Sequence, residues 1–312
     1  MPAQTEPEQP DRRAAARELA ERWAALQASE SEGIRTRAGA DRLGVAEADL
    51  VALGCGWGSA TRLRLPVLQT LIETPAERPG FMFLVRNRLA VHEVKLAPGE
   101  TPGMPGATTL KGEDFRVTVQ PDHWHEAYLV RVPGQGRAPM ESVQLFDAAG
   151  QAVAKVYALG PDGTAWAEAL RDGCADDDQE PGRPVGQGTP PSQARDPASG
   201  LPASFWDDLF QAITGTGLPV SIDLSHPGWK QNWTGVPRKA FGRGPFQNLV
   251  HSRFNLHLQF ASVCGWDWDD PGATLILTAG DKDRLTIGAG RPEHQTAWAD
   301  LVQGLLPTRT EA

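Results

Sequence analysis

The stretch Phe81–Val94, which reads FMFLVRNRLAVHEV, decides how the rest of this sequence is interpreted. Five apolar residues are followed by a polar Arg-Asn-Arg break and a second apolar run, a pattern typical of two short strands joined by a tight turn. Side chains alternate between the two faces of a strand, so His92 shares a face with Arg88, Ala90 and Val94. The pattern therefore predicts a hairpin that holds one imidazole in a mostly apolar strand.

His92 has two interpretations at this stage. The simpler one is a half-buried structural histidine, which the apolar neighbours favour. The other is an axial ligand to a haem iron, because imidazole is a common ligand in haem proteins. The residues alone leave both interpretations open.

Composition narrows the class of protein. The chain has 312 residues, 40% of them hydrophobic, and a formal net charge of -9. This balance disfavours nucleic acid as the main partner, because phosphate binding needs a basic surface. The three cysteines lie far apart and form no CxxC pair, which favours a reducing compartment. No apolar run is long enough to span a membrane, and the polar N-terminus has no signal core, so we expect a cytoplasmic protein.

Hydrophobic periodicity predicts the elements around the hairpin. Apolar spacing predicts helices over 12–28, 36–53 and 63–73, the second with a Gly turn that resembles a helix-turn-helix. Short alternating strands follow the hairpin with no helix between them, so the sheet should be antiparallel. The stretch 172–203 is rich in Pro, Gly and Asp and predicts a disordered linker. A second unit then begins with a helix, and we expect a turn over 266–272.

An internal repeat organises these elements. The heptapeptide TAWAEAL at Thr164 recurs as TAWADLV at Thr296, each after a strand pair joined by an Ala-Gly turn. We therefore predict an α+β fold made by tandem duplication of an antiparallel β-sheet unit with flanking helices. The expected parts are a disordered N-terminus (1–11), a first repeat (12–171), a disordered linker (172–203), a second, shortened repeat (204–307) and a tail (308–312).

Several motifs resemble those of the hemin-degrading factor family, the HemS/HmuS-type haem-handling proteins of bacteria. LVRNRLAVHE resembles the TRNE-AVHE signature of that family, and SVQLFDAAGQAVAKVYAL resembles its SLQFFDAAGDAVHKIYL segment. In the second half, GPFQNLVHSRFNLHL resembles GPWLNVLDPRFNLHL. The resemblance covers about 36–170 and 218–306, and it implies a fold of two tandem repeats that binds haem.

The resemblance also implies site residues. His92 matches a histidine that serves as haem ligand in some members, Arg116 matches an arginine that pairs with a haem propionate, and Arg291 matches more loosely an arginine near the haem edge. An arginine suits a propionate because guanidinium forms bidentate, charge-assisted hydrogen bonds with carboxylates. The family usually takes its principal axial histidine from a helix between the repeats. Here that helix reads Phe205–Phe210 and contains no histidine.

Other histidines are weaker candidates. His123 and His125 form a His-Trp-His motif that would place both rings on one face of an extended strand, where His92 could complete a metal site. His257, in the strand that resembles FNLHL, is interpreted as structural. We therefore expect one haem per chain, held mainly by the first repeat, with His92 on the iron.

Three functions follow as hypotheses. The first is a cytoplasmic haem-binding protein of bacterial iron utilisation, which traffics haem and in one version degrades it oxidatively with electrons from an external donor. Its partners would be haem, a haem uptake transporter and a downstream haem oxygenase or reductase. The second is a non-catalytic descendant of the same fold that acts as a binding or scaffold protein. The third, a helix-turn-helix regulator, is disfavoured by the acidic charge.

Overall fold

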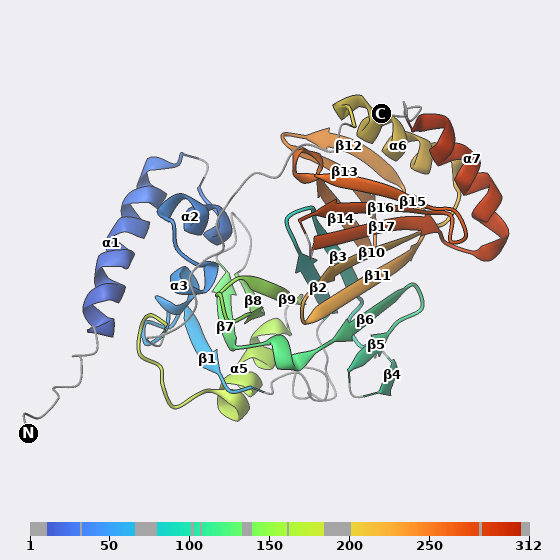
Figure 1. Cartoon of the computed structure of the whole chain (residues 1–312). Helices are drawn as coiled ribbons and strands as arrows, with labels where there is room; N and C mark the ends of the chain where they lie inside the picture. Colours follow the sequence, from blue (N-terminus) through green and yellow to red (C-terminus); the bar gives the residue numbers. More distant parts are fainter. Residues whose placement is uncertain are drawn as a thin grey trace, which may run out of the picture. The chain divides into compact units, whose positions relative to one another are not determined.

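The computed structural model describes residues 11–31, 33–65, 80–100, 103–106, 108–132, 139–160, 162–183, 201–280 and 283–306, with the backbone alone at 103–106. The chain forms two compact units (Figure 1). Unit 1 comprises Met1–Pro75, Trp124–Ala152 and Pro161–Ser192, and unit 2 comprises Ala76–His123, Val153–Gly160 and Gln193–Ala312.

Unit 1 packs helices on a small antiparallel sheet in which β7 pairs with both β1 and β8. The apolar face of α3 packs on this sheet, where Tyr128 and Phe146 are fully buried. Helix α5 contacts the same three strands. The elements of the unit are α1 (Arg12–Ser29), α2 (Thr36–Leu43), α3 (Glu47–Ala52), β1 (Ala60–Leu63), β7 (Glu126–Val132), β8 (Met140–Phe146) and α5 (Gly163–Cys174).

The helices of unit 1 follow the sequence pattern closely. Helix α2 ends at Gly44, which has a φ of 68° in the left-handed region that glycine tolerates. The predicted helical stretch 36–53 is therefore two helices with a glycine turn, as expected. The helix predicted over 63–73 is wrong at its start, because Leu63 ends strand β1, and 66–73 lie outside the described residues.

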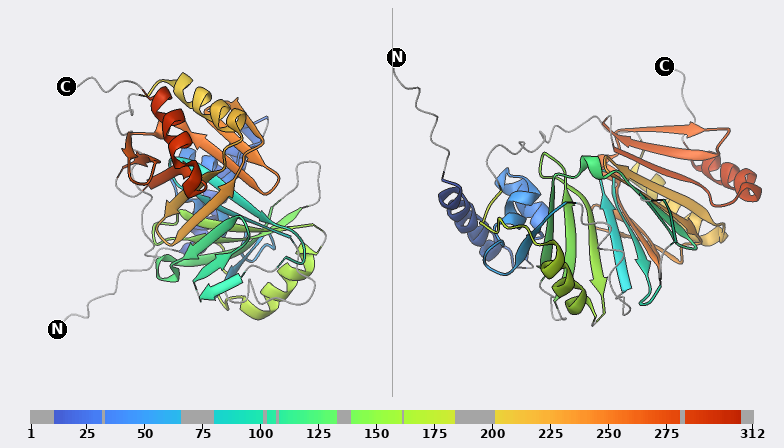
Figure 2. Two further views of the ribbon diagram at one scale, coloured as in Figure 1. Left: turned by 90° about the vertical axis from the view of Figure 1, so that its right-hand side faces the viewer. Right: turned by 90° about the horizontal axis from the view of Figure 1, so that it is seen from below.

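Unit 2 contains two antiparallel sheets, whose strands are shown from two more sides in Figure 2. In the first sheet the strands of unit 2 follow the order β9-β2-β3-β14-β13-β12, and in the second the order is β15-β16-β17-β10-β11-β6-β5-β4. Helices α6 (Ala203–Thr216) and α7 (Gln295–Leu305) contact each other, and the short 3₁₀ helices are η1 (Pro121–His123), η2 (Phe260–Ser262) and η3 (Pro292–His294).

The strands of unit 2 divide between its two sheets. The first sheet contains β2 (Gly80–Arg86), β3 (Ala90–Leu96), β9 (Ala152–Leu159), β12 (Lys239–Arg243), β13 (Phe246–His251) and β14 (Phe254–Gln259). The second contains β4 (Gly103–Gly106), β5 (Thr109–Lys111), β6 (Phe115–Val119), β10 (Val220–His226), β11 (Trp229–Gly235), β15 (Gly265–Asp269), β16 (Thr274–Ala279) and β17 (Asp283–Ala289). The expected turn over 266–272 is thus wrong in its first half, which belongs to β15.

The strand orders of unit 2 confirm the duplication and add an exchange. In the first repeat the hairpin β2–β3 pairs with β9 on one side, and in the second the hairpin β10–β11 pairs with β17 in the same way. On its other side each hairpin pairs with a strand of the opposite repeat, β3 with β14 and β11 with β6. The two predicted halves of the sequence therefore each contribute strands to both sheets of unit 2.

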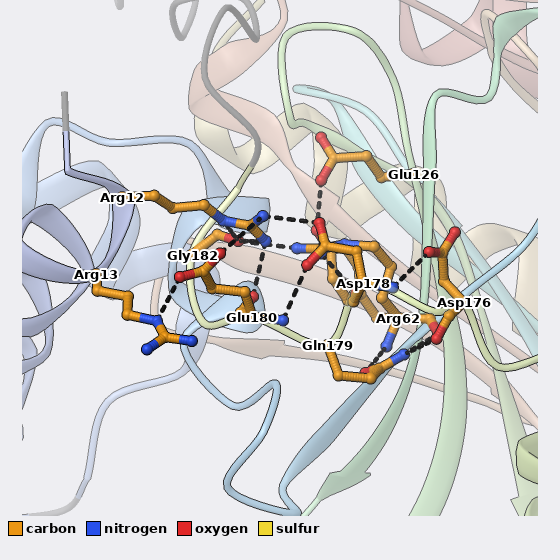
Figure 3. A network of polar contacts seen from close by, with 10 residues as sticks. Arg12, Arg13, Arg62, Glu126, Asp176, Asp178, Gln179, Glu180 and Gly182 are labelled. Atoms are coloured by element: carbon orange, nitrogen blue, oxygen red, sulfur yellow. Dashed lines mark hydrogen bonds and ion pairs between the residues drawn. The ribbon is translucent and has the colours of Figure 1, made fainter. Parts of the chain in front are cut away.

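The beginning of the expected linker is ordered. Residues 176–183, which we call the clasp, follow α5 and hold the N-terminal helix through a network of polar contacts (Figure 3). Arg12 donates to the carboxylate of Asp178 and to the carbonyl oxygen of Gly182, and Arg62 donates to the same carbonyl oxygen. The prediction of disorder from residue 172 is wrong for 172–183, and 184–200 lie outside the described residues.

Candidate functional site

His92 lies in the interior of unit 2, fully buried at 0% exposure. Its Nε2 is 3.1 Å from the carbonyl oxygen of Ile222, and its Nδ1 is 2.9 Å from Nε2 of Gln231. The orientation of the Gln231 amide is fixed, because its Oε1 accepts a hydrogen bond from the indole Nε1 of Trp229. The Gln231 nitrogen must therefore donate to Nδ1, and His92 carries its proton on Nε2, from which it donates to Ile222.

Burial lowers the pKa of His92 to about 3, although its hydrogen bonds to backbone groups oppose the shift. The imidazole is therefore neutral at ordinary pH, and both ring nitrogens are used inside the fold. The iron ligation expected of His92 stays a prediction. It would require the ring to break one of these two hydrogen bonds and to leave the core.

Arg116 lies elsewhere, on the exposed side of the second sheet of unit 2. Its neighbours on β6, Phe115 and Val117, are buried, so alternation directs Arg116 away from the interior. Lys111 is its direct neighbour on β5 and Asn232 its neighbour on β11. With Lys230, these side chains form a small basic patch, although Lys230 also lies 3.7 Å from Asp223.

Arg291 caps the short helix η3 after β17, with a side chain 66% exposed and 4.0 Å from Glu293. His92, Arg116 and Arg291 are thus on different parts of unit 2: one in the core, one on an exposed sheet face and one in a loop. The structure does not bring the three predicted site residues together.

The remaining histidines give no ready metal site. The His-Trp-His motif is not an extended strand, because His123 ends the 3₁₀ helix η1; both His123 and His125 are exposed. Among the residues that the structure describes, no three His, Cys, Asp or Glu side chains gather closely enough to hold a metal ion.

His257 has a more organised environment than the sequence indicated. Its Nδ1 is 2.6 Å from Oδ1 of Asn248, and its Nε2 is 4.0 Å from a carboxylate oxygen of Glu93. Glu93 in turn accepts a hydrogen bond of 2.7 Å from Asn255. The sequence signal was the polar alternation of Asn255, His257 and Gln259, which indicates a half-buried strand but not that its imidazole is so closely held.

Comparison with known proteins identifies part of the chain. Residues 44–172 match the model of the haemin-degrading HemS.ChuX domain. This span contains the hairpin β2–β3, Arg116 and, from unit 1, the helix α3 with strands β1, β7 and β8. Residues 44–172 are thus similar to the HemS.ChuX domain. The family resemblance inferred from the motifs is thereby confirmed for the first repeat.

Solved structures share the fold of this chain over nearly its whole length. Apo-PhuS, a heme-binding protein from Pseudomonas aeruginosa, matches with a TM-score of 0.73 and 20% identity over 94% of this chain and 100% of its own. The heme degrading enzyme ChuS of Escherichia coli O157:H7 matches with a TM-score of 0.74 and 18% identity over 94% and 100%. At such identities the likeness shows the fold, and it confirms the predicted duplicated α+β architecture. No curated protein sequence matches the chain.

None of the helices in the described part of the chain is long and apolar enough to cross a membrane.

Proposed function

We propose that this protein binds haem and acts in the cytoplasm in bacterial haem and iron utilisation, handing haem from an uptake transporter to a downstream oxygenase or reductase. The observation that carries the proposal is the HemS.ChuX match over 44–172, within a fold shared along its length with PhuS and ChuS. PhuS is described as a heme-binding protein, and ChuS is described as a heme degrading enzyme.

The residues present fit the carboxylate side of haem. Arg116 is exposed on a sheet face beside Lys111, and the described residues give it no ion pair. A guanidinium with a neighbouring ammonium suits a propionate, because charge-assisted hydrogen bonds to carboxylates are among the strongest in proteins. Arg116 therefore stays our candidate partner for a propionate on this face, and Arg291 stays a weaker one.

Oxidative degradation is a finer version of the same proposal. Bound haem would supply oxygen activation at its iron, and this chain would supply orientation and exclusion of water. Electrons would have to come from a separate donor, since the sequence shows no flavin or nicotinamide motif. Haem trafficking requires no such donor, and it is the version we favour.

The experiment is a titration of the purified full chain with hemin, followed by its Soret band. We expect a saturable shift to a sharp band with one haem per chain. A broad, non-saturating absorbance like that of hemin with an unrelated acidic protein would contradict the proposal. The same titration with Arg116→Ala, compared with Arg17→Ala on the exposed side of α1, tests the carboxylate partner.

A second candidate function is a scaffold or binding protein that has lost haem. The observation that favours it is the position of His92, whose two ring nitrogens are satisfied inside the fold. The same titration separates the candidates, because a scaffold would give no saturable Soret band.

A further inference from the structure

The outer face of the first sheet of unit 2 carries a row of side chains that runs across four strands. The register places Arg86 of β2 opposite Val91 of β3, Val91 opposite His257 of β14, and His257 opposite Asn248 of β13. Along β3, the residues directly before and after Val91 are Ala90 and His92, and both are buried. The row therefore lies on the opposite side of this sheet from His92.

The position of the proton on His257 is fixed by Asn248. The amide nitrogen of Asn248 donates to the carbonyl oxygens of Phe241 and Phe246, at 2.9 and 3.3 Å. Its Oδ1 must therefore be the atom that faces His257, and Nδ1 of the ring donates to it over 2.6 Å. Asn248 is itself 4% exposed, so this hydrogen bond is well defined.

This arrangement is the one that protein metal ligands use. A ligating histidine usually donates its second ring N–H to a fixed acceptor, which sets the tautomer and the orientation of the ring. With Nδ1 protonated, the lone pair of a neutral ring lies on Nε2, an atom through which imidazoles can coordinate a metal ion. The side chain of His257 is 33% exposed, whereas that of His92 is fully enclosed. Glu93, 4.0 Å from Nε2, is held in place by Asn255.

The surroundings of His257 also suit a porphyrin. Val91 lies directly beside it on β3. Farther along the same face, the half-buried Leu84 and Met82 lie two strands from His257 and Tyr157 three strands from it, with Glu93 and Lys95 of β3 between. Half-buried apolar side chains on a sheet face favour contact with a flat apolar ligand. Arg86, in the same row as His257, supplies a cation two strands away from the imidazole.

The duplication makes the comparison with the Arg116 face direct. Phe115 and Phe254 occupy equivalent positions, because β6 pairs with β11 there as β14 pairs with β3. Arg116 thus corresponds to Asn255, and Thr118 corresponds to His257. The face with Arg116 has threonine where the other face has an imidazole, and no histidine lies at the exposed positions of the described strands β5, β6 and β11.

We infer that His257, on the outer face of the first sheet of unit 2, is the axial ligand through which this chain binds the iron of haem. The inference rests on the proposed function, and it replaces His92 by a histidine of the second repeat. The inference likewise replaces Arg116, which lies on the second sheet, by Arg86 as the candidate for a propionate, because Arg86 lies in the same row as His257.

The test is a hemin titration of His257→Ala, with His92→Ala and His251→Ala as comparisons. His251 is a matched control, since it is a half-buried histidine at the end of the neighbouring strand β13. We expect His257→Ala to lose at least ten-fold in hemin affinity and to change its ferric Soret position and spin state. His251→Ala should keep all three properties, and thermal melting shows that each variant is folded.

Imidazole added to His257→Ala provides a readout that a purely structural role would not give. If the ring binds iron, exogenous imidazole should restore the original ferric spectrum. Unchanged affinity and spectrum in His257→Ala, with loss in His92→Ala or Arg116→Ala, would overturn the inference and leave haem binding standing. Absence of a saturable Soret band in the unaltered chain would instead remove the proposed function itself.

Discussion

His92 and Gln231 occupy equivalent positions in the two repeats and hydrogen-bond to each other, with Nδ1 of the imidazole 2.9 Å from the amide nitrogen. Each also reaches across to the other hairpin in the same way. His92 contacts the carbonyl oxygen of Ile222, and Gln231 donates to that of Phe83, which is the counterpart of Ile222. Equivalent residues that contact each other reciprocally are typical of a two-fold symmetric interface. The pair therefore joins the two sheets at the centre of their duplication.

Replacing His92 by alanine should destabilise the fold. The change leaves a cavity and removes one acceptor from the buried Gln231 amide, so we expect a loss of roughly 2–4 kcal/mol in the free energy of unfolding. Urea denaturation measures it. Gln231→Ala should cost a similar amount, and the double variant less than the sum, because the two residues act as a pair. A loss below about 0.5 kcal/mol would contradict this structural role.

The buried imidazole should also make stability depend on pH. Its pKa is about 3 in the folded chain, against about 6.5 when the chain is unfolded. Between these values the unfolded state binds the extra proton, so stability falls as the pH is lowered from about 6.5 towards 3, by up to about 1.4 kcal/mol per pH unit. Above pH 6.5 His92 contributes no dependence.

The measurement is the urea midpoint at pH 7 and pH 5 for the unaltered chain and for His92→Gln. Glutamine does not titrate, so this variant should lose part of the difference between the two pH values. Other groups also titrate in this window, including His251, whose pKa is lowered mainly by burial. The difference between the urea midpoints at pH 7 and pH 5 is compared between the unaltered chain and His92→Gln, which isolates the contribution of His92. An equal difference in the two proteins would refute that contribution.

Sequence reasoning found the elements of unit 2 but not their pairing. Alternation predicts that His92 and Val94 share a face, and the structure agrees. Alternation cannot say which face is enclosed, because that depends on the second sheet, whose strands come from the other repeat. The exchange of β6 and β14 between repeats is a long-range event with no local signal. His92 was therefore placed correctly on its strand, whereas the hydrogen bonds of its ring to Ile222 and Gln231 had no signal in the sequence.

The clasp was missed for a different reason. A Pro-, Gly- and Asp-rich stretch without large apolar residues predicts disorder because it cannot bury a core. Here the order comes from arginines supplied by distant parts of unit 1. Arg183 pairs with the buried Glu126, and Arg12 and Arg62 both donate to Gly182. The composition of a segment shows how much apolar surface it can bury itself. It does not show which polar partners other parts of the chain provide.

The clasp gives a test with adjacent arginines. The side chain of Arg12 is 15% exposed and donates to Asp178 and to two backbone carbonyls, whereas that of Arg13 is 73% exposed and contacts only Glu180 in the described chain. We expect Arg12→Ala to cost roughly 1.5–3 kcal/mol, the scale of hydrogen bonds to charged groups. Arg13→Ala should stay within about 0.5 kcal/mol, as exposed ion pairs usually do.

Hydrogen exchange locates the effect of Arg12→Ala. The amide of Gly182 donates to the carbonyl oxygen of Ala52, so loss of the clasp should speed its exchange and that of the amides of α1. The amides of unit 2 serve as the internal control. If Gly182 kept its protection in Arg12→Ala, or if Arg13→Ala exposed it equally, the clasp would not depend on Arg12.

The contact between α1 and α2 depends on a glycine. Gly39 lies inside α2 and against the ring of Trp23, where an added Cβ would be 2.1 Å from Cζ3 and 2.6 Å from Cη2. Helix propensity alone predicts that Gly39→Ala stabilises the chain by about 1 kcal/mol. The clash predicts the opposite sign, because the large indole ring or the whole of α1 must move, at a cost of roughly 1–3 kcal/mol. The sign of the change in unfolding free energy therefore decides between the two effects.

Trp23→Leu removes the ring that clashes, so in that background Gly39→Ala should become neutral or stabilising. A stabilising Gly39→Ala in the unaltered chain would show that α1 does not pack on α2 through this contact.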